Sequence, residues 1–105
     1  GYAEFGSNHA VAIMPGELAP VIAFGGTDTA AESCLGQDWN FSPFVDASPS
    51  RKLLVFGITN DQIGYILNGN SWHSYLTENE EIVSTGPRAG ETIASAYLTL
   101  VTKVR

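Results

Sequence analysis

Residues 53–67 read Leu-Leu-Val-Phe-Gly-Ile-Thr-Asn-Asp-Gln-Ile-Gly-Tyr-Ile-Leu, which is two apolar runs separated by a polar triplet. The first run is rich in β-branched and aromatic residues and has no helical polar face, so it predicts a buried strand. The Asn60-Asp61 pair marks a turn, and a second strand is expected to complete a central hairpin. Packing on both sides would fix its polar tip, where scaffolds often hold reactive side chains, and Tyr65 is the candidate.

The chain upstream of this stretch predicts a second hairpin. Tyr2–Phe5 and the apolar segment His9–Met14 flank a three-residue, glycine-containing connection that suits a tight turn. Pro15 and Gly16 then stop the second arm, which presents Glu17 just beyond a strand end. We expect a short helical turn within residues 18–24, whose start is limited by a proline.

Residues 25–50 form a long loop in this prediction, because periodicity vanishes and glycine, proline and aspartate recur. The loop also contains three large aromatic side chains, Trp39, Phe41 and Phe44. These aromatics either line a substrate groove or pin the loop to the core, and pinning is favoured because buried aromatics supply most of a loop's anchoring. Cys34 is expected to be a small buried hydrophobe or half of a bridge to another chain.

The C-terminal third predicts a turn, a loop and a helix. Asn68-Gly69-Asn70 is a turn signal, and residues 71–81 are polar enough to be a loop. Apolar residues then recur at helical spacing after Pro87, which predicts an amphipathic helix over about residues 87–103 that packs on the sheet. The expected inward face comprises Ile93, Ala96, Tyr97, Leu100 and Val101. The fold class is therefore α/β of the α+β kind, with a small mixed sheet and a C-terminal helix.

The amino-acid composition limits the classes of partner that this chain can bind. Hydrophobic residues make up 44% of the 105 residues and charged residues only 15%, compared with about 25% in ordinary soluble domains. We infer that another chain, or another part of the same chain, covers some of this surface; the alternative is a monomer with a neutral polar surface. The formal net charge of -6 without a basic cluster argues against nucleic acid. No apolar run approaches the ~20 residues of a transmembrane helix.

Glu17 and Tyr65 are the candidate functional pair. Adjacent strands would bring this carboxylate and phenol to one rim of a sheet, where a zinc ion can take a carboxylate oxygen. The metal could draw the tyrosine into coordination or strengthen its hydrogen bond to an oxyanion. A catalytic zinc usually takes three protein ligands, and neither His9 nor His73 has the spacing of a zinc motif. The residues alone leave the function open.

Three blocks resemble the neutral/alkaline non-lysosomal ceramidase family. They are Met-Pro-Gly-Glu at residues 14–17, Gly-Ile-Thr-Asn-Asp-Gln-Ile-Gly-Tyr-Ile at residues 57–66, and Glu-Ile-Val-Ser-Thr-Gly-Pro at residues 81–87. The blocks occur in the family's order, and the similarity spans nearly the whole chain. It covers only the later part of the family's catalytic domain, so residues 1–105 resemble the C-terminal portion of such a domain.

The resemblance implies a zinc-dependent amidase that cleaves the N-acyl bond of a ceramide-like lipid. In the family, zinc is held by two histidines from an earlier segment, by the glutamate of the first block and by the tyrosine of the second. These last two correspond to Glu17 and Tyr65, and Tyr65 would also stabilise the tetrahedral oxyanion. Glu81 and Ser84 of the third block are interpreted as structural support.

The two histidine ligands have no counterpart among these residues, so a second polypeptide or a missing N-terminal segment is expected to supply them. Without it the chain should be inactive. The resemblance also implies a secreted, extracellular or periplasmic protein, and Asn40-Phe41-Ser42 fits the N-glycosylation pattern. Asn79 replaces a tyrosine common in the family, and the loop over residues 25–50 differs from better-known members, which leaves the acyl substrate open. The alternative function is a non-catalytic structural or interaction module that keeps the fold without the metal.

Overall fold

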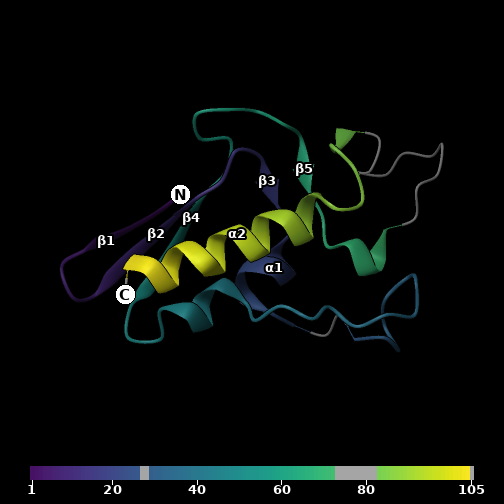
Figure 1. Ribbon diagram of the computed structural model, residues 1–105, viewed down its shortest axis with the longest axis horizontal. Coiled ribbons are helices and arrows are strands. Elements are labelled where there is room, and N and C mark those ends of the chain that lie inside the picture. The colour runs from purple at the N-terminus through teal and green to yellow at the C-terminus, as the bar shows by residue number, and fades with distance from the viewer. Residues whose placement is uncertain (27–28, 73–82, 105) are drawn as a thin grey trace.

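The computed structural model describes residues 1–26, 29–72 and 83–104 (Figure 1). Within them a three-stranded sheet, ordered β1-β2-β4, and a two-stranded sheet, β3-β5, are joined by a long C-terminal helix. The small mixed sheet and the C-terminal helix confirm the predicted α+β class. The elements are β1 (Tyr2–Phe5), β2 (His9–Ile13), β3 (Glu17–Leu18), α1 (Pro20–Phe24), the 3₁₀ helix η1 (Phe44–Ala47), β4 (Lys52–Phe56), β5 (Tyr65–Ile66), the 3₁₀ helix η2 (Gly69–Ser71) and α2 (Ala89–Val104).

The N-terminal hairpin is confirmed. Strands β1 and β2 pair antiparallel with Phe5 opposite His9, and Gly6 adopts a φ of 61° in the connection. Glycine reaches this left-handed conformation without the steric cost of a side chain. The predicted short helix is also present as α1, which starts at Pro20 because proline is tolerated in the first turn.

The predicted central hairpin is wrong. Strand β4 pairs in parallel with β2, whereas β5 pairs in parallel with β3 in the other sheet. The connection between β4 and β5 bonds to the end of β2 instead of folding back: Thr59 N–H donates to the Met14 carbonyl at 2.9 Å and Ile63 N–H to the Pro15 carbonyl at 3.0 Å. Because the Thr59 and Ile63 N–H groups bond to residues 14 and 15, they cannot pair β4 with β5 in a hairpin.

Strand β4 is also not a buried strand. Its residues alternate between exposed and half-buried, so Leu54 and Phe56 remain 47% and 53% exposed. This alternation is expected for an edge strand of which only one face meets the core. Leu53 and Val55, on the opposite face, pack against the core.

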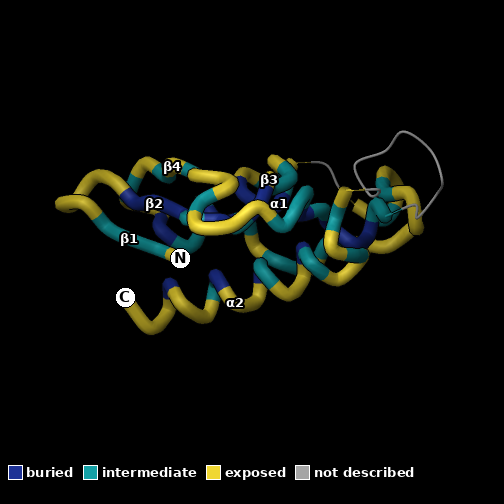
Figure 2. The backbone as a smooth tube through the Cα atoms, turned by 90° about the horizontal axis from the view of Figure 1, so that it is seen from above, coloured by how far each residue is buried: buried dark blue, intermediate teal, exposed yellow. Residues whose placement is uncertain are grey.

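Helix α2 begins at Ala89, two residues after the predicted start, and its buried face is rotated from the predicted one. Gly90, Ala94, Tyr97 and Val101 are buried, whereas Ala96 and Leu100 are exposed. Figure 2 shows these buried positions on the side of α2 that faces the strands. Gly90 lies on this buried face, where a side chain would collide with the Leu67 carbonyl.

Aromatic packing unites the helix, the loop and the first sheet. The Tyr97 ring stacks on Phe44 with 3.9 Å between centroids and meets Tyr2 edge-on at 5.9 Å. Phe44 is fully buried, so this part of the 25–50 loop is pinned to the core. The buried cluster comprises Ala12, Met14, Ile22, Phe44, Ile66, Ala94, Tyr97 and Val101.

Helix α2, with 16 residues, is the longest helix among the described residues. Across those parts of the chain, none of the helices combines the length and apolar character that a bilayer span requires.

The Tyr97 hydroxyl has no hydrogen-bond partner within the described residues, and burial raises the pKa of Tyr97. We therefore expect Tyr97→Phe to leave stability at pH 7 unchanged or raise it by about 1 kcal/mol. An unfolded tyrosine loses its proton near pH 10, while the buried one keeps it. The native chain should thus lose stability above about pH 10, by up to ~1.4 kcal/mol per pH unit, and Tyr97→Phe should not. Urea unfolding at pH 7 and pH 11 measures both effects.

Tyr2→Phe is the matched control, because the Tyr2 hydroxyl bonds to Glu4 Oε1 at 2.7 Å and lies 2.8 Å from Ser48 Oγ. Ser48 is fully buried, so this variant should lose about 1 kcal/mol at pH 7. A larger loss for Tyr97→Phe than for Tyr2→Phe would show that the Tyr97 hydroxyl is bonded after all.

Candidate functional site

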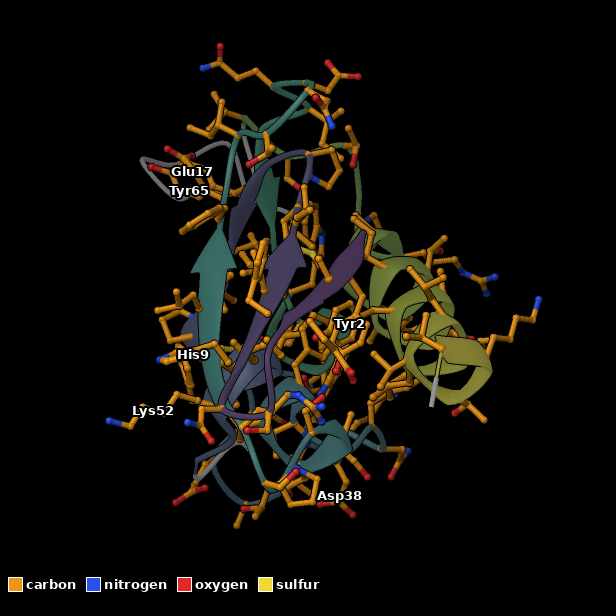
Figure 3. All side chains as sticks on the ribbon, turned by 90° about the vertical axis from the view of Figure 1, so that its left-hand side faces the viewer. Tyr2, His9, Glu17, Asp38, Lys52 and Tyr65 are labelled. Carbon is orange, nitrogen blue, oxygen red and sulfur yellow. The ribbon has the colours of Figure 1, made fainter. Side chains whose placement is uncertain are left out.

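Glu17 and Tyr65 lie directly opposite each other in the parallel pair of β3 and β5. Cross-strand partners point to the same side of a sheet, so the carboxylate and the phenol share one rim. Figure 3 shows the two labelled side chains as neighbours on one side of the molecule. Glu17 is exposed and Tyr65 half-buried, so neither side chain is enclosed in the apolar core.

Backbone hydrogen bonds fix this register. Glu17 N–H donates to the Gly64 carbonyl at 3.2 Å, and Ala19 N–H donates to the Ile66 carbonyl at 2.9 Å. Ile66 is fully buried, and since side chains alternate along a strand, its burial turns Tyr65 to the opposite face. Tyr65 also pairs in parallel with Ser84, so three separate segments meet at this tyrosine.

Two glycines permit the close approach of these segments. A side chain at Gly16 would collide with the Gly64 carbonyl, and one at Gly64, where φ is 93°, would collide with the Val83 carbonyl. The sequence pattern predicts only a strand-breaking role for Gly16 and no role for Gly64. The signal was present in the sequence, since each glycine directly precedes one residue of the candidate pair.

The connection from β4 to β5 holds a strained residue next to the pair. Ile58 has a φ of 53°, an uncommon conformation for a β-branched side chain, and its N–H donates to the Gly16 carbonyl at 3.4 Å. Asn60 has a φ of 68°, which asparagine tolerates more readily. Strain of this kind costs about 1–3 kcal/mol per residue and is concentrated at functional sites.

The remaining candidate residues do not join the pair. His9 is exposed at the start of β2, away from Glu17 and Tyr65 (Figure 3). Its strand partners are Phe5 and Lys52. The positions of His73 and Glu81 fall outside the described residues. Ser84, the other residue interpreted as structural support, accepts a hydrogen bond from Gly86 N–H at its Oγ, at 3.4 Å.

Two oxygen donors constitute only part of a zinc site. Carboxylate oxygen suits zinc, and a phenol oxygen beside it can either coordinate or donate a hydrogen bond. In the described portion of the chain, no three His, Cys, Asp or Glu side chains gather where they could hold a metal ion. The donor set is therefore compatible with a zinc ion only if further ligands come from elsewhere.

Two other predicted positions lie on the surface. Cys34 is exposed, so the expectation of a buried thiol is wrong. It lies in a turn-rich part of the 25–50 loop, where few apolar neighbours are available to cover it. Asn40 and Ser42 are also exposed, and glycosylation at Asn40 stays a prediction.

No protein-family model, no curated protein and no solved structure matches this chain. Residues of all three sequence blocks meet around Tyr65.

The close contacts at Gly16 and Gly64 lead to a testable prediction about the free energy of unfolding. Gly64→Ala should lower the free energy of unfolding by about 3 kcal/mol or more, because it combines a left-handed φ with a collision against backbone. Gly6→Ala is the matched control: its φ of 61° is similarly unfavourable, but open space surrounds it, so about 1 kcal/mol is expected. Urea unfolding measures both. Equal losses would mean that the segments do not pack this closely.

Proposed function

We propose that this chain is the C-terminal part of a zinc-dependent amidohydrolase that cleaves the N-acyl bond of a ceramide-like lipid. The observation that carries the proposal is the register of β3 and β5, which puts Glu17 opposite Tyr65 on an accessible rim. A carboxylate and a phenol at one such point are the two ligands that the resemblance implies.

The meeting of the three sequence blocks supports the proposal. Residues 14–17 and 57–66 are joined by backbone hydrogen bonds at Gly16 and Pro15, and residue 84 of the third block pairs with Tyr65. Blocks that are distant in sequence, and that were chosen for their resemblance alone, thus adjoin one another in space. Strain at Ile58 in the second block adds to this argument, because such strain is typical of functional sites.

Glu17 and Tyr65 would hold the zinc ion together with ligands from outside this chain. When bound, zinc supplies a water of lowered pKa and polarises the amide carbonyl. Glu17 contributes negative charge that favours a cation at the rim. Tyr65 would donate a hydrogen bond to the oxyanion that develops on the amide oxygen, and the burial of Ile66 on the other face of β5 supports this role by turning Tyr65 toward the rim.

A second polypeptide, or a segment preceding this one, would supply the two histidines. Exposed apolar side chains next to the pair favour such a partner: Phe56, Ile58 and Val83 are 53%, 45% and 56% exposed. Exposed apolar side chains that gather in one patch mark interaction surfaces or grooves for apolar ligands, and we propose that these three belong to such a patch. The same surface suits the chains of a lipid amide, and a secreted or periplasmic location remains part of the proposal.

A non-catalytic module is the second candidate. It is favoured by the lack of a three-residue metal cluster within the described residues. The exposure of Glu17 argues against it, because the carboxylate opposite Tyr65 is accessible to a metal ion and is not enclosed in the apolar core.

Zinc content tests the proposal. In the complete protein, Glu17→Gln should reduce bound zinc at least ~10-fold, because it removes the charged ligand while preserving side-chain size. Tyr65→Phe should reduce amidase kcat by about 10²–10³ with a smaller effect on zinc, if its main role is at the oxyanion. Metal analysis by mass spectrometry and hydrolysis of a fluorescent N-acyl sphingoid amide provide the two measurements.

Glu32→Gln is the matched control, since Glu32 is an exposed carboxylate of the 25–50 loop. It should retain both zinc and activity, and thermal unfolding should confirm that all three variants fold. Unchanged zinc content in folded Glu17→Gln protein would remove the basis for the proposed metal site.

The chain alone should not hydrolyse the amide, because two ligands do not retain a catalytic zinc. The measurement is turnover by the purified 105-residue chain with and without added zinc. Turnover above the uncatalysed rate would show that no partner is needed.

A further inference from the structure

Two adjoining hollows flank residues 38–41. Figure 3 shows Asp38, which lines both of them, on the opposite side of the view from Glu17 and Tyr65. Their volumes are about 400 and 370 Å³, within the usual range for small-molecule sites. Asp38, Trp39, Asn40 and Phe41 line both hollows. The first is completed on one side by Val21 of α1, and the second is bounded by Glu91 of α2.

Trp39 and Phe41 form an aromatic wall between the two hollows, and the buried core packs against one side of it. The rings of Trp39 and Phe41 lie 4.9 Å apart at an interplanar angle of 46°, and both pack against the buried core. Each ring therefore pins the loop, as predicted, and also borders open space. A side chain locked by packing on one side presents a binding surface of fixed shape on the other.

The aromatic wall also contains a buried hydrogen-bond donor, Trp39 Nε1, that has no acceptor within the described residues. Tryptophan N–H groups usually find a partner when buried, and an unsatisfied one requires an explanation. Trp39 lines both hollows, so a ligand bound there is the candidate source of the missing acceptor.

Acidic and amide groups complete the polar part of the site. Asp38 Oδ1 accepts a hydrogen bond from Ala30 N–H at 2.7 Å, which orients this carboxylate at the edge of the hollows. Asn40 is exposed beside it and offers both a donor and an acceptor. No lysine or arginine lines either hollow as far as the structure is described.

These groups discriminate between ligand classes. An anion would meet the Asp38 carboxylate and no compensating cation. A cation would be attracted to the carboxylate and the rings, but it would leave the indole N–H unsatisfied. A neutral ring with several hydroxyl groups meets every requirement: hydroxyl oxygens accept from Trp39, hydroxyl protons donate to Asp38, and a C–H face packs on the aromatic rings.

We propose that the hollows around Trp39 and Phe41 bind a pyranose sugar. This site is separate from the Glu17–Tyr65 pair and does not depend on the function proposed for it. Glucose, galactose and N-acetylglucosamine differ in the groups they would offer to Asn40, and the structure favours none of them over the others.

The test is a titration of ¹⁵N-labelled protein with the methyl β-pyranosides of these three sugars, followed by NMR. At least one should bind with a Kd in the millimolar range, about 1–10 mM, as expected for a small open site. Binding should shift the indole N–H signal of Trp39 while leaving that of Trp72 in place. Saturation transfer should reach the ring C–H protons of the sugar.

Substitutions at Trp39 and Asp38 measure how much each side chain contributes to the affinity for the sugar. Trp39→Phe keeps an aromatic ring without the N–H and should weaken binding about 3–10-fold, and Asp38→Asn should do the same by losing a charged acceptor. Trp39→Ala should abolish detectable binding. Asp46→Asn is the matched control, because Asp46 is an exposed carboxylate on η1 outside both hollows, and its affinity should be unchanged.

Three results would overturn the proposal. The first is that none of the three pyranosides shifts the Trp39 signal. The second is that tetramethylammonium shifts it and competes with any pyranoside effect, which would identify a cation cage. The third is that Trp39→Phe and Asp38→Asn, both folded by circular dichroism, bind a pyranoside as tightly as Asp46→Asn.

Discussion

The stacking of Tyr97 on Phe44 is the contact on which the rest of the structure depends. It joins α2 to η1, and the edge-on contact with Tyr2 extends the same packing to β1. Buried aromatic side chains remove about 150–250 Å² each from water and dominate the energetics of small cores. The described residues form two small sheets, of three and two strands, which leaves few other contacts to hold the layers together.

The candidate pair inherits its geometry from this core. Strands β3 and β5 have two residues each, too short to be stable by themselves. Their register is imposed by Ile66 inside the core and by the close passage of glycine backbone at residues 16 and 64. The accessible rim is thus rigid because its neighbours are buried, which is the arrangement that a metal or a developing charge requires.

Short-range sequence patterns predicted the first hairpin and the two α-helices, but they did not predict which strands pair in the 53–67 stretch. The first hairpin, α1 and α2 follow from a glycine turn, a first-turn proline and helical periodicity, all of which act over a few residues. The 53–67 stretch was misassigned because apolar runs joined by Asn-Asp are equally compatible with a hairpin and with strands in two sheets. The choice is made by hydrogen bonds to residues 14–16, which are distant in sequence. Glu17 and Tyr65 were found by residue type, but their register depends on Gly64, whose tight contact with residue 83 no local pattern reveals.

The parallel pairing of β2 with β4 and of β3 with β5 has a kinetic consequence. Paired residues in the two ladders lie 43 and 48 positions apart in the sequence, so a long loop must close before either pair can form. Loop-closure entropy makes such non-local pairing slow compared with the closing of a hairpin or a helix. Helix α2 and the β1–β2 hairpin are accordingly expected to form early, with the Glu17–Tyr65 rim among the last features to be assembled. A peptide that contained only one of the two strands would carry the residue but not the arrangement.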